Sequence, residues 1–409
     1  MRRMRRGLAL PAIVLAVALV AAGCSGGGGG GDANKPLVIG ASLPLSGDFA
    51  QPGEASRRGY TIWQDMVNAN GGLLGRQVEL KIVDDASSQD TVVSDYNRLI
   101  TQNKVDLLLG TFSSLLNIPA SAAAEKAGMT YVCPSCGSPA MFNRKFKHIF
   151  FAQPAVASHQ GDLFAQYIAG LPADQRPKTA AYPTQDDPFA QPVVEGIKAK
   201  LEAAGIKTVY SKVYPPDTSN FDTIASDIKA SKADLIAQGA VFEDGVGLVR
   251  SLVKAGYSPK QMFQTSAPSN GDQYSKGVGV GNTQGVFYAV SWSPQAKYPL
   301  NQEFLQAYKA KYGGVPEEDA ADAFAAAQVL QAAVQAVGSV DDQAKISDWL
   351  HKNKVETILG PLSWDDKGAP QQAFILAQWQ NGAAQVVLPK EVATSQTIVN
   401  PKPNWGAQG

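Results

Sequence analysis

The sequence predicts an α/β protein with two Rossmann-like lobes, each a doubly wound parallel sheet, joined by a hinge of three extended segments. Short apolar runs alternate with helical patterns along most of the chain, which is typical of parallel βαβ units. The chain of 409 residues exceeds the roughly 250–300 at which a single hydrophobic core stops growing, so two lobes are expected. Three extended segments interrupt the alternation, and each is suited to crossing between lobes.

The alternation falls into two blocks. The first contains apolar strands such as LVIGASLPL, VELKIVDD and VDLLLGT, and the second contains KTAAYPTQ, TVYSKVYP and ADLIAQGA. The crossings are expected at HIFFAQP, GVFYAVSW and TILGPLSWDDKG. Helices are predicted over 54–70, 91–103, 189–204, 221–230, 247–255, 299–312, 319–337 and 341–353, and a hairpin turned at Asn381-Gly382. The expected limits are 36–152 plus 289–362 for the N-terminal lobe, 153–288 plus 363–396 for the C-terminal lobe, and 397–409 for a tail.

The first residues predict an export signal and a lipid anchor. Four arginines precede an apolar run over 8–22, which is the order found in a signal peptide, here 1–23, and the run is short for a membrane-spanning helix. The small residues before Cys24 resemble the lipobox of bacterial lipoproteins; the alternative is an ordinary cleavage site with an incidental cysteine. Residues 24–35 are glycine-rich and predict a flexible tether. We expect an exported protein that is lipid-anchored to the outer face of the cytoplasmic membrane, in the cell envelope.

The charge of the remaining chain excludes one class of partner. Removal of residues 1–23 takes away four arginines and no acid, which leaves 386 residues with a formal net charge of −4. No basic patch suited to nucleic acid is present, so we expect no nucleic-acid partner.

The stretch over 105–139, VDLLLGTFSSLLNIPASAAAEKAGMTYVCPSCGSP, reads as strand, polar loop, helix, strand and second polar loop. Loops that follow parallel strands meet at the carboxyl edge of the sheet, where ligands bind. The helix that follows the first loop adds free backbone N–H groups and the positive end of its dipole, so a carboxylate is the expected guest. The alternative is that the serines only cap the helix. The candidate residues in the two loops are Ser113, Ser114, Ser135, Gly137 and Ser138.

A longer segment, VIGASLPLSGDFAQPGEASRRGYTIWQDMVNANGGLLGRQVELKIVDDASSQ, resembles the N-terminal signature of the Leu/Ile/Val-binding protein family, the type I solute-binding proteins of ABC importers. The resemblance recurs in GTFSS, DTSNFD and GPLSWDDKGAPQQAF, so it covers nearly the whole body. It implies a type I periplasmic binding protein of the Venus-flytrap kind, whose lobes close on a small-molecule ligand by hinge motion. It also implies delivery to an ABC permease and ATPase complex. We expect a monomer without catalysis, cofactor or metal.

The resemblance also implies ligand-binding positions. Ser114 matches the serine that holds the ligand carboxylate, and Gln51 matches a loop glutamine near the cleft. Gly137 stands where a threonine usually binds both carboxylate and ammonium. In the second lobe, Phe189 stands where a tyrosine covers the ligand, and Phe242 falls near another aromatic residue of the cleft.

The largest departure from the family pattern is Ala267, which stands where amino-acid binders carry the glutamate that pairs with the α-ammonium. A buried ammonium without an acid costs several kcal/mol. Two alternatives follow. Either an acid of a neighbouring loop supplies the charge, or the ligand lacks an ammonium and is an aromatic or aliphatic carboxylate or amide. The candidate acids are Asp186, Asp187, Glu243 and Asp244.

Cys133 and Cys136 form a C-x-x-C motif in an exported chain, for which a local disulfide, a redox pair and half of a zinc site compete. A redox pair should open a helix, whereas the residues after Cys136 continue a loop. A zinc site needs more ligands, and the chain has three histidines. We therefore favour a disulfide that stiffens the ligand loop.

Two other functions compete with that of a binding protein. An anchored envelope hydrolase would need a nucleophile elbow, G-x-S-x-G at a strand-to-helix turn, with an acid and a histidine, and no predicted strand-to-helix turn of the sequence carries that pattern. A sensor that presents its closed form to a signalling partner has the same sequence features as an importer component, so that alternative stays open.

Overall fold

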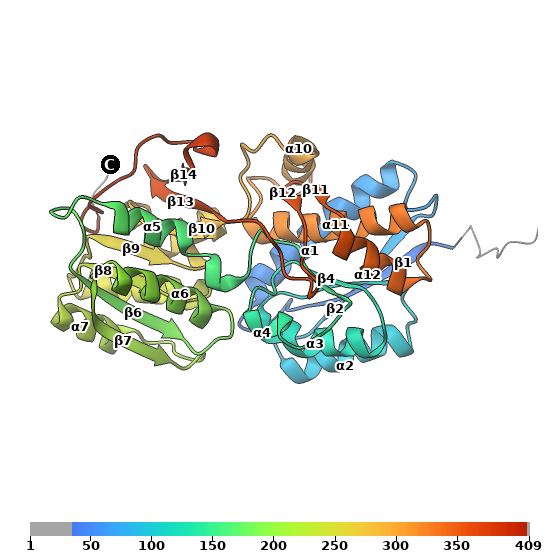
Figure 1. Ribbon diagram of the computed structural model, residues 1–409, viewed down its shortest axis with the longest axis horizontal. Helices are drawn as coiled ribbons and strands as arrows, with labels where there is room; N and C mark the ends of the chain where they lie inside the picture. Colours follow the sequence, from blue (N-terminus) through green and yellow to red (C-terminus); the bar gives the residue numbers. More distant parts are fainter. Residues whose placement is uncertain (1–34, 407–409) are drawn as a thin grey trace, which may run out of the picture. The chain divides into compact units, whose positions relative to one another are not determined.

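The computed structural model describes residues 35–406. The expected signal peptide, Cys24 and the rest of 1–34 lie outside the described residues, so those predictions stay predictions. Two large sheets lie in two separate lobes, as predicted (Figure 1). Among residues 35–406, no helix is both long enough and apolar enough to cross a membrane.

The first lobe is built on a five-stranded parallel sheet with the order β2-β1-β3-β4-β5. Its central strands are apolar on both faces because helices cover both sides of the sheet. The strands are β1 (Leu37–Leu43), β2 (Val78–Asp84), β3 (Leu107–Leu109), β4 (Tyr131–Cys133) and β5 (Ile149–Phe151).

The helices of the first lobe come from two distant parts of the chain. They are α1 (Ala50–Ala69), α2 (Gln89–Thr101), α3 (Ser114–Lys126), α4 (Pro139–Phe142), α10 (Asn301–Tyr312), α11 (Glu318–Val337) and α12 (Gln343–Lys352). One hydrophobic core joins the sheet to α1, α10, α11 and α12, and a second core joins its other face to α2, α3 and α4. The C-terminal helices therefore complete the layer that α1 begins.

The second lobe is built on a seven-stranded mixed sheet with the order β14-β13-β10-β9-β8-β6-β7. Its strands are β6 (Thr179–Gln185), β7 (Lys207–Tyr214), β8 (Leu235–Gln238), β9 (Gln261–Gln264), β10 (Val286–Val290), β13 (Ile375–Gln380) and β14 (Ala383–Leu388). Its helices are α5 (Asp162–Gly170), α6 (Ala190–Ala203), α7 (Asp222–Ser231), α8 (Phe242–Lys254) and α9 (Gly271–Val278). One face of the sheet packs against α5 and α6, and the other packs against α7, α8 and α9.

The chain passes between the lobes after β5, after β10 and between the short hairpin β11 (Val355–Thr357) and β12 (Gly360–Leu362) and strand β13. Strand β10 pairs with β13 as far as Val290, so the second crossing begins slightly later than the expected boundary at residue 288. Strands β13 and β14 form the predicted hairpin, with Asn381 in the left-handed region at φ 52°.

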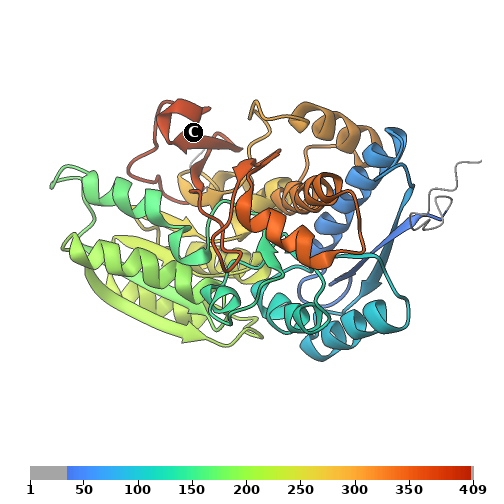
Figure 2. The ribbon, with the colours of Figure 1, turned by 45° about the vertical axis from the view of Figure 1, so that its right-hand side comes forward.

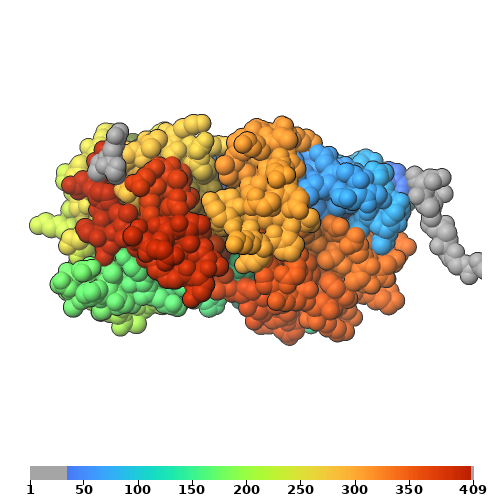
Figure 3. Space-filling view, turned by 90° about the horizontal axis from the view of Figure 1, so that it is seen from above, coloured from blue at the N-terminus to red at the C-terminus, as the bar shows by residue number. Residues whose placement is uncertain are grey.

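The described part of the predicted tail packs on the second lobe. The indole Nε1 of Trp405 donates to the carbonyl oxygen of Tyr257 at 2.6 Å, and the amide of Gln378 donates to the carbonyl oxygen of Val399 at 2.9 Å. In the space-filling view these C-terminal segments appear in red against the rest of that lobe (Figure 3). These hydrogen bonds from side chains to backbone oxygens attach the tail to the lobe. They involve no helix or strand, so the sequence of the tail shows no hydrophobic periodicity.

Helices α1 and α11 pack unusually closely, and this contact positions the start of α11. Figure 2 shows α1 in blue beside the orange C-terminal helices. A Cβ atom at Gly59 of α1 would lie 2.0 Å from the backbone oxygen of Ala320 on α11. The indole Nε1 of Trp63 also donates to Gln331 Oε1 at 2.8 Å. Glycine is therefore required at position 59 by proximity to another backbone.

Replacing Gly59 by alanine is expected to force the two helices apart. We predict that Gly59→Ala lowers the free energy of unfolding by about 1–3 kcal/mol, although alanine is the better helix former. The control is Gly170→Ala at the end of α5, where an added Cβ meets no atom within 4 Å. Urea unfolding of both variants checks the prediction, and equal stability of the two would contradict the close packing.

Candidate functional site

A cavity of about 60 Å³ lies between residues of the two lobes, at the carboxyl ends of strands from both sheets. This is where open parallel sheets bind ligands. The first lobe and the crossing after it contribute Phe112, Ser113, Ser114, Ser135, Gly137, Phe151, Gln153, Glu318, Asp319 and Asp322. The second lobe contributes Gln160, Asp187, Phe189, Val241, Thr265, Ser266, Ser269 and Ala289.

Helix α3 points its N-terminus at this cavity. Ser113 caps the helix, because its Oγ accepts a hydrogen bond from the Leu116 N–H at 3.3 Å. The first helical bond runs from the Asn117 N–H to the Ser113 carbonyl oxygen, so the N–H groups of Ser114 and Leu115 precede the helical ladder. Ser113 has φ 69° and ψ 147°, a backbone conformation that residues other than glycine rarely adopt. The strained cap and the helix dipole make this corner suitable for an anion.

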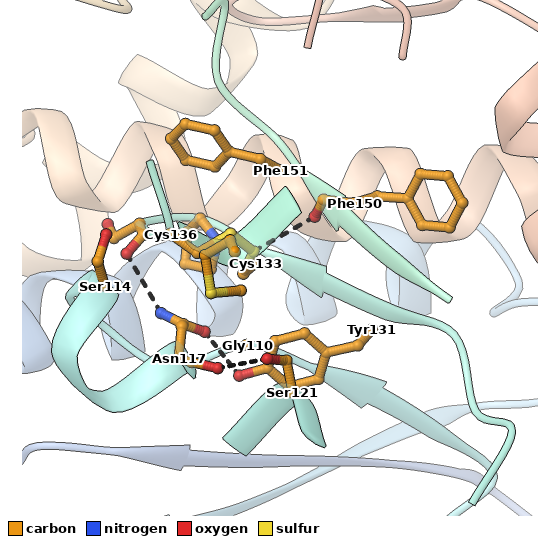
Figure 4. The surroundings of a disulfide bond; sticks show 12 residues. Gly110, Ser114, Asn117, Ser121, Tyr131, Cys133, Cys136, Phe150 and Phe151 are labelled. Carbon is orange, nitrogen blue, oxygen red and sulfur yellow. Dashed lines mark hydrogen bonds between the residues drawn. A yellow bond between two sulfur atoms is a disulfide. The ribbon is translucent and has the colours of Figure 1, made fainter. Parts of the chain in front are cut away.

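Asn117, one turn into α3, holds both polar loops. Its Nδ2 lies 2.8 Å from the carbonyl oxygens of Thr111 and Ser113 and 3.2 Å from that of Ser135. Its Oδ1 accepts from the Tyr131 hydroxyl at 2.6 Å, and Figure 4 shows the two side chains facing each other. A single buried amide thus fixes the spacing of the loops. The sequence did not reveal this role, because an asparagine on a predicted helix is usually exposed.

The second loop is closed by a disulfide between Cys133 and Cys136, with their Cα atoms 5.9 Å apart (Figure 4). Ser135, between the two cysteines, lines the cavity. The structure therefore pairs the cysteines as the disulfide interpretation proposed. The bond constrains the loop that carries Ser135.

Gly137 lines the cavity, and an aromatic ring lies close to where its side chain would be. A Cβ at Gly137 would lie 3.2 Å from the ring of Phe151. Ser138 does not line the cavity; its N–H donates to Ser114 Oγ at 3.0 Å, and its own Oγ accepts from the Ala140 N–H. Ser138 therefore joins the two loops and caps α4, and the structure places it behind Ser114.

Three carboxyl groups that were not predicted from the sequence enter the cavity from the first two turns of α11. They belong to Glu318, Asp319 and Asp322. Ser291 Oγ lies 2.7 Å from Glu318 Oε1 and 2.6 Å from Asp322 Oδ1, and its single proton can be donated to one of these oxygens at a time. Within the described part of the chain, no hydrogen bond reaches the carboxylate of Asp319. Acids at the start of a predicted helix are common, so PEEDAAD was no distinctive signal.

The environment of these acids shifts the pKa of each of them upward. Burial raises the pKa of Glu318, and hydrogen bonds from Ser291 oppose that rise. Burial and the nearby carboxylates raise the pKa of Asp319 and Asp322 well above the ordinary value. Three acids that share one cavity repel each other when ionised, so a positive group between them would be strongly stabilising.

One candidate acid of the second lobe joins them. Asp187 lines the cavity, and its Oδ1 accepts from the N–H groups of Phe189 and Ala190 at 2.8 and 2.9 Å. Burial raises its pKa, while the two backbone bonds lower it. Among the described residues that line the cavity there is no lysine, arginine or histidine. The cavity thus has four acids and no basic side chain.

Three phenylalanine rings provide its apolar part. Phe189 was expected there, whereas Phe112 and Phe151 were not. Phe112 packs edge-on against Phe49, with ring centroids 5.7 Å apart, and Phe151 stacks on Phe142 at 6.5 Å. Phe151 ends the strand β5, which the sequence marked as a crossing.

Comparison with known proteins decides the family. Residues 36–384 match the family model described as periplasmic binding protein. The chain belongs to the periplasmic binding protein family. An amino acid binding protein of Pseudomonas aeruginosa is 26% identical to it over 361 residues, which cover 86% of this chain and 92% of that one.

Two solved structures share the fold of this periplasmic binding protein. One is LivJ of Streptococcus pneumoniae in complex with isoleucine, with a TM-score of 0.76, 22% identity, and coverage of 87% of this chain and 100% of LivJ. The other is an ABC transporter solute binding protein of R. palustris in complex with benzoate, also with a TM-score of 0.76 and 22% identity, covering 91% of this chain and 99% of that one.

Several positions carried over from the family lie away from the cavity of this periplasmic binding protein. Ala267 is fully buried in the core of the second lobe, and Phe242 packs against the same core. Gln51 lies in the first turn of α1, and its buried amide has no hydrogen-bond partner in the described part of the chain. Near Ala267, the residues Thr265 and Ser266 line the cavity instead.

Three of the four candidate ammonium partners also lie elsewhere. Asp186 accepts from Gln191 Nε2 at 2.7 Å in a separate surface groove, and Glu243 is exposed on α8. Asp244 is buried against the Tyr214 hydroxyl, which donates to it at 2.8 Å, and burial raises its pKa to about 7. Of the acids in these two loops, only Asp187 therefore lines the cavity.

Asn117 offers a test of the loop scaffold of this binding protein. We predict that Asn117→Leu lowers the free energy of unfolding by about 3 kcal/mol, because it removes the buried amide that bonds the carbonyl oxygens of Thr111 and Ser135 and the Tyr131 hydroxyl. The control is Asn97→Leu, which removes a bond from an exposed asparagine of α2 to the Val93 carbonyl and should cost less than about 0.5 kcal/mol. Denaturant unfolding distinguishes them, and a small loss for Asn117→Leu would refute its role.

Proposed function

We propose that this chain is the extracytoplasmic solute-binding lipoprotein of an ABC importer, and that it captures an amino acid between its lobes. Membership of the periplasmic binding protein family supports the binding role. A relative named as an amino acid binding protein supports the ligand class. The predicted signal peptide and Cys24 support export and anchoring, which would keep the protein beside a membrane permease.

One observation carries the choice of ligand. The N-terminus of α3 with Ser114 lines the same cavity as the acids of α11 and Asp187. Donors at one corner suit a carboxylate, and acids at the other suit an ammonium. An amino acid carries both groups. The acids of α11 provide the charge whose absence at Ala267 had left the ammonium without a partner.

A carboxylate without an ammonium is the second candidate. The rings of Phe112, Phe151 and Phe189 would suit an aromatic acid, and the R. palustris protein of the same fold holds benzoate. Such a ligand would bring a negative charge into a cavity with four acids and no basic side chain. The charge balance therefore favours the amino acid.

A thermal-shift screen followed by calorimetry tests the proposal. Amino acids are expected to raise the melting temperature, and benzoate is expected to have little effect. Ser114→Ala should weaken binding of the best amino acid by roughly 1.5–3 kcal/mol, the range of a hydrogen bond to a charged group. Ser94→Ala, at an exposed position of α2, is the control and should leave affinity unchanged. Stabilisation by benzoate alone would favour the second candidate.

Binding should depend on pH with a defined sign. Because the cleft acids have raised pKa values in the free protein, part of their protons must leave when an ammonium binds. Affinity for an amino acid is therefore expected to increase with pH, below the pKa of the ligand's own ammonium. Calorimetry in buffers of different ionisation enthalpy should record proton release, and proton uptake would contradict the assignment.

A further inference from the structure

The number of acids in the cavity exceeds what one α-ammonium requires. Asp187, Glu318, Asp319 and Asp322 line the same space. A single zwitterion brings one positive charge together with a carboxylate, so it adds no net charge. Uncompensated carboxylates in a closed cavity cost several kcal/mol each when ionised.

The hydrogen bonds divide these acids into two kinds. Asp187 is held by the backbone of α6, and Asp322 receives Ser291 Oγ on Oδ1 and Gln153 Nε2 on Oδ2, at 2.6 and 2.7 Å. Asp319 receives no hydrogen bond from the described residues. Asp319 is thus the acid with the most acceptor capacity left for a ligand.

A second, independent acceptor faces the same space from the other lobe. Gln160 is 9% exposed, and its Oε1 is buried without a hydrogen-bond partner among the described residues. Gln160 also lines the cavity. A buried carbonyl oxygen without a donor costs about 1–3 kcal/mol, so its presence indicates a donor supplied by the ligand.

We propose that the ligand is a basic amino acid whose second positively charged group is bound by Asp319, with its neighbour Glu318, and by the free oxygen of Gln160. This inference rests on the proposed function, because it assumes that an amino acid occupies the cavity. The phenylalanine rings fit the same ligand. Its methylene stem would pack on their faces, which also attract a cation through the ring quadrupole.

The test compares L-lysine with L-norleucine, which has a methyl group at the chain end instead of the aminomethyl of lysine. Calorimetry is expected to find that lysine binds at least tenfold more tightly. Asp319→Asn should weaken lysine binding far more than norleucine binding, and so remove most of that preference. The control Asp348→Asn changes an exposed acid of α12 and should preserve the preference. Melting temperatures of the free variants verify folding.

Each other outcome overturns a defined part of the account. Equal or tighter binding of norleucine would refute the second charge site and leave amino-acid capture intact. A lysine preference that persists in Asp319→Asn would refute the assignment to this cluster. If neither compound binds and no other amino acid raises the melting temperature, the proposed function itself fails.

Discussion

The free N–H groups at the start of α3 and the carboxyl groups of α11 face one small cavity, and the two-lobed architecture holds them there. The N-terminus of α3 cannot satisfy its first N–H groups within the helix. Burial and mutual repulsion raise the pKa of Asp319 and Asp322, so ionisation of the acids of α11 is unfavourable without a positive partner. The parallel sheets bring the loops to this edge, Asn117 fixes their spacing, and the α1–α11 contact fixes the acids. A ligand with both charges would satisfy both ends at once.

The acid that pairs with an ammonium need not come from the position that the family pattern predicts. Ala267 is buried in the core and faces no ligand, and Gly137 leaves room for the ring of Phe151. The charge is instead available on α11, in the other lobe. In the proposed function, α11 supplies the acid for the ligand's ammonium, so the lobe that carries this acid differs from the family pattern.

The sequence predicted the two sheets and the loops around Ser114 because those features follow from local periodicity and from the rule that parallel strands share an edge. It did not predict the acids of α11, because helix-start acids look the same whether they face solvent or a cleft. Phe112 and Phe151 were read only as parts of a loop and a strand. Asp186 and Glu243 were proposed from loop proximity, but side-chain direction is set by helix packing that a linear pattern does not contain. The disulfide could be predicted because Cys133 and Cys136 are close in sequence and form a C-x-x-C motif.

The most direct test of this account is a crystal structure of the complex with L-lysine. The account predicts that the ligand carboxylate lies within hydrogen-bond distance of the Ser114 hydroxyl and the first N–H groups of α3, with an ammonium against Asp319. A carboxylate bound away from α3, or a cavity closed by the protein's own side chains with the ligand elsewhere, would contradict it.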